Sequence, residues 1–512
     1  MSVLDDVIDR IGNRFFGERE GAAGGDRMPG LTAKGFDMAD GGRCSWVEAP
    51  PEFAATSAQT AGLWPYCVGT SSPLIGAPLG RNTNNGSVVC GDPISLFIRG
   101  TISSPSGFIM GLNGRGKSSV TVRICIYLSS LSFVPLILGD LKPDYVGMIK
   151  EIGGQVIRVG PGIGSVNPLD AGPLWNRVDE LPVAKRNELL SEIHTRRVNT
   201  VRGLLELARG RGLDTEKQEP TVLSMAIRTA TVRAEAEGRQ PLLGDLVTAI
   251  REAPAEMQAV TLANDAAEFL AESKSLVKGL IGLLEDGPFG DVFCKPTTQQ
   301  MRVDRPACFD VSGVDISDEM MRAAIQIVCW AYGQAGVSAA KTLAVAGLEP
   351  QRHHLMIMDE LWQTLRASEL LVHQIDALTR LNRQKGLGQI MITHTMKDLT
   401  LSTEQLSEIA RGFLERSSVK YFGGLARNEM ELLEQVLPLS QREKDLLVEW
   451  SAEGATDPRT GRSLPPPGRG RFMMKLGENA PGVPFKMNLT DTEHRIHDTN
   501  EAWVEAMARA RA

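Results

Sequence analysis

The stretch Gly111-Leu112-Asn113-Gly114-Arg115-Gly116-Lys117-Ser118 fits the pattern G-x-x-x-x-G-K-[ST]. It follows the apolar run Phe108-Ile109-Met110, and the residues after it predict a helix that continues to Leu131. A buried strand, a glycine-rich turn and a helix that begins at the lysine are the context in which this pattern binds phosphate. A chance match is the alternative, but a random match rarely lies between an apolar run and a helix. We therefore expect a phosphate-binding loop.

In such a loop, backbone N–H groups surround the phosphate oxygens and the helix N-terminus adds positive potential. The residues expected to bind the nucleotide are Gly111, Asn113, Gly114, Arg115, Gly116, Lys117, Ser118 and Ser119. Lys117 is expected to reach the β- and γ-phosphates, and the Ser118 hydroxyl to bind Mg²⁺. ATP and Mg²⁺ are the expected cofactors, because no N-K-x-D tetrapeptide that would read guanine occurs in the sequence.

A second motif is an apolar run, residues 355–358, that ends in the adjacent carboxylates Asp359 and Glu360. A hydrolytic nucleotide site needs acidic groups beside its phosphate loop. Asp359 is expected to bind Mg²⁺ by holding a water of its shell, and Glu360 to orient and deprotonate the attacking water. An ordinary strand end is the alternative, but the phosphate loop in the same chain favours the catalytic interpretation.

Another apolar run predicts a strand that ends at His394, where a sensor of the γ-phosphate would lie. A strand-end histidine with a structural role is the alternative. Arg383, with Arg380 beside it, precedes this strand and is expected to act on the nucleotide of a neighbouring subunit. Reserve candidates for this role are Arg416 and Arg427. For any one of these arginines alone, ordinary surface charge is the competing interpretation.

The composition limits the classes of partner. The 512 residues include 55 Lys and Arg and 62 Asp and Glu, a formal net charge of −7, so no global positive field attracts the chain to nucleic acid. The seven cysteines form no C-x-x-C pair, which suggests neither a disulfide framework nor a zinc site. The most apolar window, residues 124–139, is shorter than the ~20 residues that span a bilayer. We expect a cytoplasmic chain without direct membrane insertion.

Strands alternate with helices before residue 172 and again after residue 301, which predicts an α/β fold with a mostly parallel sheet. The expected organisation is a flexible N-terminal tail (1–60), a first core part (61–172), an all-α insertion (173–300) and a second core part with C-terminal strands and a helix (301–512). Residues 94–99 are expected to form a hairpin strand. Arginines of the insertion are interpreted as a solvated face, with contact to a polyanion as the alternative. They are Arg196, Arg197, Arg202, Arg209 and Arg211.

Taken together, these motifs resemble the ATPases of conjugation and type IV secretion (the TraC and TrbE class), within the HerA/FtsK group of P-loop motors. The segments that carry the resemblance are 76–81, 111–119, 140–145, 153–157, 166–170, 356–361, 470–475 and 489–493. It covers about residues 60 to 505. It implies a RecA-like P-loop NTPase core, ATP hydrolysis in a homo-hexamer, and a peripheral position at the inner face of the cell membrane.

The sequence departs from this family at two points. Members commonly have Gln where His394 stands, and longer relatives carry a separate N-terminal domain where this chain has a short tail. We therefore expect contact with membrane-embedded secretion or conjugation subunits through another chain.

Two other functions remain open, and the transported substrate could be DNA or protein. An FtsK/HerA-like translocase of double-stranded DNA predicts a basic pore and hydrolysis stimulated by DNA, and the net charge argues mildly against it. A nucleotide-dependent scaffold of a secretion complex is disfavoured because Lys117, Asp359 and Glu360 are all of competent residue types.

Overall fold

The computed structural model describes residues 31–32, 35–36 and 72–496, with gaps at 285–286, 288, 316, 368, 370–371, 374, 377–378, 381–385, 455–464 and 478–479. The chain divides into two compact units, Met1–Gly69 and Thr70–Ala512. In the first unit, β1 (Leu31–Thr32) and β2 (Gly35–Phe36) form an antiparallel pair. The rest of the tail predicted for residues 1–60 lies outside the described residues.

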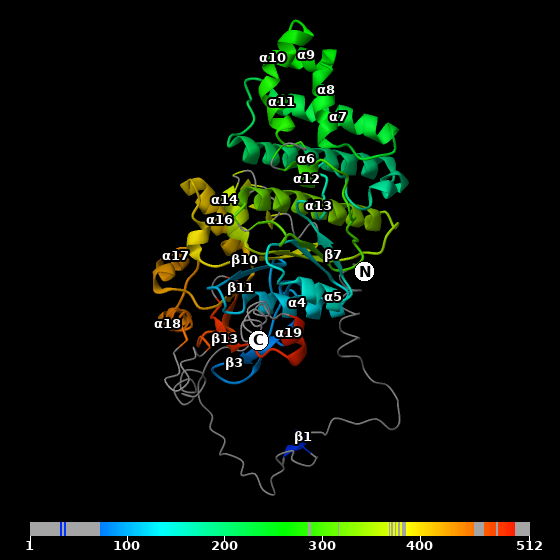
Figure 1. Cartoon of the computed structure of the whole chain (residues 1–512). Helices are drawn as coiled ribbons and strands as arrows, with labels where there is room; N and C mark the ends of the chain where they lie inside the picture. Colours follow the sequence, from blue (N-terminus) through cyan, green and yellow to red (C-terminus); the bar gives the residue numbers. More distant parts are fainter. Residues whose placement is uncertain are drawn as a thin grey trace, which may run out of the picture. The chain divides into compact units, whose positions relative to one another are not determined.

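The second unit is built on one sheet of eleven strands (Figure 1). The strands are β3 (Pro78–Asn82), β4 (Val88–Cys90), β5 (Ser106–Met110), β6 (Val134–Asp140), β7 (Gln155–Arg158), β8 (Ala307–Asp310), β9 (His354–Met358), β10 (Leu387–Thr393), β11 (Val419–Phe422), β12 (Arg471–Leu476) and β13 (Val483–Lys486). Their order is β4-β3-β13-β12-β11-β5-β10-β9-β6-β8-β7. The strands from β11 to β7 are parallel, and β12, β13, β3 and β4 extend the sheet in antiparallel fashion. The expected α/β class with a mostly parallel sheet is confirmed.

The central strands are apolar throughout because both faces of the sheet are covered. Along β5, Phe108 and Met110 belong to one core, whereas Ile109 belongs to the other. The helices α3 (Pro93–Ile98), α4 (Lys117–Ser130) and α5 (Val146–Glu151) cover the face of Ile109. The opposite face is covered by α13 (Glu319–Val345), α14 (Leu361–Ala367) and α16 (Glu404–Arg416).

Between β7 and β8, every regular element of the described residues is helical. These elements are η1 (Trp175–Glu180), α6 (Val183–Arg209), α7 (Glu219–Ala236), α8 (Leu243–Arg251), α9 (Ala255–Thr261), α10 (Ala266–Glu272), α11 (Lys274–Ile281) and α12 (Gly290–Phe293). Helix α6 packs on α13, and the apolar residues of α6, α7 and α8 continue the core of the sheet (Figure 1). The boundaries placed at residues 173 and 300 stay a prediction.

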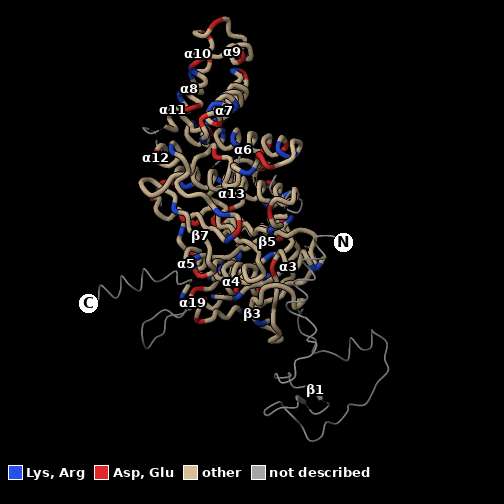
Figure 2. Tube along the Cα trace, turned by 90° about the vertical axis from the view of Figure 1, so that its right-hand side faces the viewer, with Lys and Arg blue, Asp and Glu red and all other residues tan. Residues whose placement is uncertain are grey.

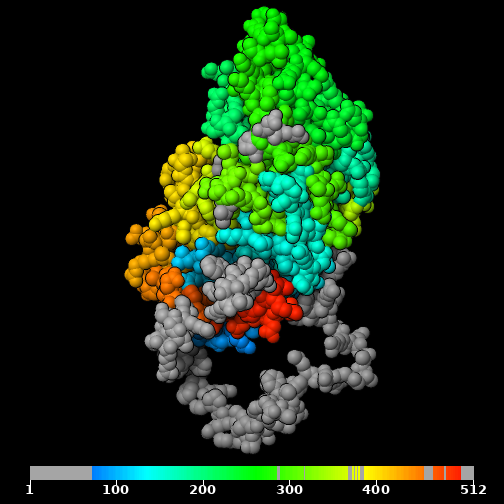
Figure 3. Space-filling view, in the orientation of Figure 1, coloured from blue at the N-terminus to red at the C-terminus, as the bar shows by residue number. Residues whose placement is uncertain are grey.

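The C-terminal part adds short elements around the end of the sheet. They are η2 (Met396–Leu399), η3 (Arg427–Glu429), α17 (Met430–Glu434), α18 (Gln441–Glu449) and α19 (Asp491–Ile496). Figure 3 shows α19 in red beside the cyan surface of α5, which it contacts. Within the described part of the chain, no helix combines the length and apolar character needed to cross a membrane.

Two local predictions were wrong. Residues 93–98 form α3 instead of a hairpin strand: the Asp92 carboxylate accepts hydrogen bonds from the N–H groups of Ile94 (3.0 Å) and Ser95 (2.7 Å). Pro93 occupies the first helical position, where its missing N–H costs nothing. The solvated face predicted for the insertion fails at Arg197, which is 4% exposed and donates to the Leu169 carbonyl (2.6 Å).

Candidate nucleotide site

The phosphate loop connects β5 to α4, which begins at Lys117 as predicted. Gly114 (φ +72°) and Gly116 (φ +99°) both adopt left-handed backbone conformations that glycine adopts at little cost. Gly116 is the N-cap of α4, so the free N–H groups of the first helical turn face the loop. Gly114 and Gly116 are therefore the residues that this backbone conformation favours.

Strand order brings the two chemical motifs together. Strand β10 lies between β5 and β9 and is parallel to both. The carboxyl ends of parallel strands meet at one edge of a sheet, where open α/β sheets bind ligands. Lys117 after β5, Glu360 after β9 and His394 after β10 consequently converge, although they are far apart in the sequence.

Lys117 is buried at this edge, with a residue exposure of 8%. Its ammonium nitrogen donates to the carbonyl of Gly111 (2.8 Å) and lies 2.7 Å from Nδ1 of His394. Burial lowers the pKa of Lys117 to about 8, against the opposing influence of the Asp359 and Glu360 carboxylates. The carboxylates of Asp359 and Glu360 therefore favour the charged form of the Lys117 amine. A bound phosphate would stabilise this charged form further.

The His394 imidazole connects the lysine to the acid. An ammonium group can only donate, so Nδ1 of His394 accepts from Lys117 and the ring proton lies on Nε2. Nε2 then donates to Oε2 of Glu360 at 2.8 Å. The backbone N–H of His394 is fixed by the Asp398 carboxylate (3.0 Å). This arrangement fixes both the tautomer and the orientation of the ring.

Glu360 receives three side-chain hydrogen bonds. Besides His394, Lys142 donates to Oε1 (2.8 Å) and the Trp362 indole donates to Oε2 (2.6 Å). Burial alone would raise the pKa of Glu360, but the hydrogen bonds from His394 and Lys142 outweigh it and hold the pKa well below its usual range. Glu360 also has φ +49°, an uncommon conformation for a residue other than glycine. The carboxylate is thus anionic and held in a fixed direction.

Asp359 is held by a residue that the sequence did not single out. The Tyr145 hydroxyl donates to Oδ2 of Asp359 at 2.6 Å, and the backbone N–H of Glu360 donates to Oδ1 (2.7 Å). Burial raises the pKa of Asp359, and Glu360 adds to this effect. Tyr145 is itself placed by Asp140, whose Oδ2 accepts from the Tyr145 N–H (2.9 Å). Both residues lie in the segment 140–145, which carries part of the resemblance, but the sequence assigned Tyr145 no role.

The oxygens expected to bind Mg²⁺ belong to Ser118 and Asp359, which line one cleft. The Ser118 hydroxyl donates to Oδ2 of Asp144 at 3.0 Å, and Asp144 lines the same cleft. No cluster of three or more His, Cys, Asp or Glu suited to a metal occurs among the described residues. Mg²⁺ needs no such cluster when phosphates and waters complete its shell, so a hydroxyl and a carboxylate fit the ion.

These groups line one cleft of about 1900 Å³, large enough for a nucleoside triphosphate. From the phosphate loop it includes Asn113, Gly114, Gly116, Lys117, Ser118 and Ser119. The acids and the sensor candidate also line it, together with Lys142. Its far side is formed by C-terminal residues that the sequence did not indicate, including Arg469 and Arg495.

Some predicted residues lie elsewhere. The Arg115 guanidinium is buried against the C-terminal part, where it donates to the Ser451 carbonyl (2.8 Å), and its side chain does not line the cleft. Arg383 falls outside the described residues. Arg380 and Arg416 both pair with Asp376, and neither lines the cleft of its own chain.

The fold of this chain is similar to that of solved proteins. No protein-family description and no curated protein matches this sequence. The solved structure of VirB4 of Thermoanaerobacter pseudethanolicus is similar at a TM-score of 0.58 and 17% sequence identity, over 83% of this chain and 100% of that chain. The bacterial conjugative coupling protein TrwB is matched at a TM-score of 0.46 and 14% identity, over 83% of this chain and 97% of that chain. The likeness to VirB4 confirms the expected RecA-like P-loop NTPase fold.

Proposed function

We propose that this chain is an ATP-hydrolysing motor that energises substrate transfer or assembly of a conjugative or type IV secretion apparatus. The observation that carries the proposal is the contact chain Lys117–His394–Glu360, which joins a phosphate-binding lysine to a carboxylate at the end of a neighbouring strand. The fold shared with VirB4 and the resemblance of the ordered motifs to type IV secretion ATPases support the same function.

The residues of the cleft divide the chemistry among them. The phosphate loop binds the triphosphate, and Lys117 contacts its terminal phosphates. Ser118 and Asp359 hold Mg²⁺, which when bound neutralises charge on the phosphate oxygens. Glu360 orients and deprotonates the attacking water. His394 is held between Lys117 and Glu360. When Lys117 contacts the γ-phosphate, the hydrogen bonds of His394 change, and this changes the position of the Glu360 carboxylate.

Binding of ATP changes the contacts of the cations in the cleft. Lys117 bonds to Gly111 and His394, and Lys142 bonds to Glu360. A γ-phosphate competes for the Lys117 ammonium group because it is a stronger anionic acceptor than a carbonyl or an imidazole. Binding of ATP therefore weakens the contact of Lys117 with His394, which is the residue that connects Lys117 to Glu360.

The resemblance supports the assembly that we propose. We place the chain in a homo-hexamer at the inner face of the cell membrane, in contact with membrane-embedded secretion subunits through another chain. Arg383 is the arginine that acts on the nucleotide of the neighbouring subunit, with Arg380 beside it; Arg380 lies outside the cleft of its own chain, as a residue acting in trans does. The transported substrate is DNA or protein.

The test is ATP turnover of the purified chain and two variants. Lys117→Ala and Glu360→Gln are each expected to lower kcat by about 10²–10³-fold, the size of effect seen when a group that stabilises the transition state is removed. Lys444→Ala and Glu434→Gln are the matched controls, because these two residues pair with each other at 2.7 Å outside the cleft.

Unchanged turnover in Glu360→Gln would remove that carboxylate from the mechanism. Strong stimulation of the wild-type chain by double-stranded DNA would instead favour the FtsK/HerA-like translocase. Nucleotide binding without measurable turnover in the wild-type chain would favour the scaffold.

A further inference from the structure

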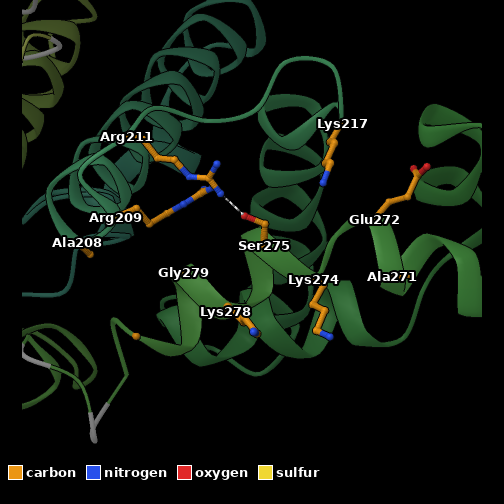
Figure 4. Close-up of a pocket in the computed structure, with 11 residues that line it drawn as sticks. Ala208, Arg209, Arg211, Lys217, Ala271, Glu272, Lys274, Ser275, Lys278 and Gly279 are labelled. Carbon is orange, nitrogen blue, oxygen red and sulfur yellow. Dashed lines mark hydrogen bonds between the residues drawn. The ribbon is translucent and has the colours of Figure 1, made fainter.

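A second cavity, of about 740 Å³, lies among the helices between β7 and β8. It is formed by the end of α6, the segment before α7, and the adjoining parts of α10 and α11 (Figure 4). Five of its lining residues are basic: Arg209, Arg211, Lys217, Lys274 and Lys278. Glu272 is the one acidic lining residue. The cavity shares no lining residue with the nucleotide cleft.

One wall of this basic cavity is fixed in place. The Arg209 guanidinium donates to both carboxylate oxygens of Glu219, at 3.0 and 3.2 Å, and Glu219 is only 1% exposed. Arg209 (2.9 Å) and Arg211 (3.0 Å) both donate to the Ser275 hydroxyl. Figure 4 shows these two guanidinium groups side by side above Ser275. The two arginines are therefore positioned before any ligand arrives.

The other cations lack counter-charges. Arg211, Lys217, Lys274 and Lys278 form no ion pair among the described residues, and all four are exposed. Some other basic residues of α6 are paired, as in Lys185–Glu188 (2.9 Å) and Arg202–Glu206 (3.9 Å). Figure 2 shows Lys and Arg interspersed with Asp and Glu along the helices. Like charges gathered without partners repel one another, so an anion in the cavity lowers the energy of the chain.

We propose that this cavity binds a small, multiply phosphorylated anion of about the size of a nucleotide. Arginine forks and lysine ammonium groups are the usual protein ligands of phosphate. The volume of about 740 Å³ lies within the range of small-molecule sites. A nucleic-acid strand would need a continuous basic track, whereas the unpaired cations gather at one cavity. A small ligand with several phosphates can contact several of these cations within the one cavity.

The probe is sodium tripolyphosphate, titrated by calorimetry into the full chain carrying Lys117→Ala, which weakens the phosphate loop. The pocket variant adds Lys274→Ala and Lys278→Ala. The matched control adds Lys185→Ala and Arg186→Ala instead, which removes the same charge from exposed positions paired with Glu188 and Asp179. Saturable binding is expected, about tenfold weaker in the pocket variant and unchanged in the control, and weaker as salt is raised.

Three results would overturn the proposal. Tripolyphosphate could fail to bind saturably, or both double variants could lose affinity equally, which would indicate general electrostatic attraction. Binding of a single-stranded oligonucleotide or of polyglutamate through Lys274 and Lys278, without binding of tripolyphosphate, would indicate a macromolecular ligand. Equal melting temperatures of the ligand-free variants establish that the fold is intact. The titration requires no ATP turnover, so its outcome is independent of the motor function.

Discussion

The ammonium nitrogen of Lys117 lies 2.7 Å from Nδ1 of His394, although the two residues are 277 positions apart in the sequence. The contact exists because β10 pairs directly with β5, so the residue after β10 emerges beside the first turn of α4. The same imidazole donates to Glu360 at 2.8 Å. His394 thereby links the lysine of the phosphate loop to the proposed base.

The dual contact of His394 predicts which replacement is tolerated. A glutamine has an amide oxygen that can accept from Lys117 and an NH₂ group that can donate to Glu360. We expect His394→Gln to keep kcat within a few-fold of wild type and His394→Ala to lower it by about 10²-fold. ATP turnover measures both. Equal, small effects of the two variants would indicate that His394 is only a structural strand-end residue.

Nucleotide affinity is expected to depend on pH through Lys117. Burial lowers its pKa from 10.5 to about 8, and a bound phosphate raises the pKa again because it stabilises the charged form. Binding is therefore strongest below about pH 8 and weakens as pH rises through that value, approaching tenfold per pH unit. Titration with ADP between pH 6.5 and about pH 9.5 measures this. In Lys117→Ala, the weakening above pH 8 should disappear.

Lys142 is expected to restrain the proposed base. It donates to Oε1 of Glu360 at 2.8 Å and helps to hold the pKa of Glu360 low, which makes the carboxylate a weaker base. The Lys142 side chain is 51% exposed, so its removal leaves the core intact. We expect Lys142→Ala to raise ATP turnover by a few-fold. Lys150→Ala is the control, since Lys150 lines the same cleft and donates no hydrogen bond to Glu360.

A fall in turnover in the Lys142→Ala chain, with Lys150→Ala unchanged, would contradict the restraint. It would show that Lys142 assists the reaction directly.

Tyr145 is expected to position the metal-binding carboxylate. Tyr145→Phe removes the hydroxyl that donates to Asp359 at 2.6 Å but keeps the buried ring. A hydrogen bond to a charged group contributes about 1.5–3 kcal/mol, so we expect the Mg²⁺ concentration for half-maximal turnover to rise about tenfold. Affinity for ADP measured without Mg²⁺ should stay the same. A change in that affinity, with the Mg²⁺ requirement unaltered, would place Tyr145 in nucleotide binding instead.

The sequence by itself determined the parts that depend on local physics. Apolar runs identified the strands before Gly111 and Asp359, because strands covered on both faces have no polar positions. The glycines of the phosphate loop marked a backbone that bends into left-handed conformations. The start of α3 was also encoded locally, because an Asp-Pro pair such as Asp92-Pro93 favours the start of a helix. The strand prediction for residues 94–99 did not use this signal.

Only the tertiary structure decided which polar groups meet. The placement of β10 between β5 and β9 sets His394 against Lys117 and Glu360, and the turn after β6 brings Tyr145 to Asp359. The cations of the basic cavity likewise come from α6, from the segment between α6 and α7, and from α11. Strand order and helix packing arise from burial of apolar surface over the whole chain, so no local pattern specifies these contacts.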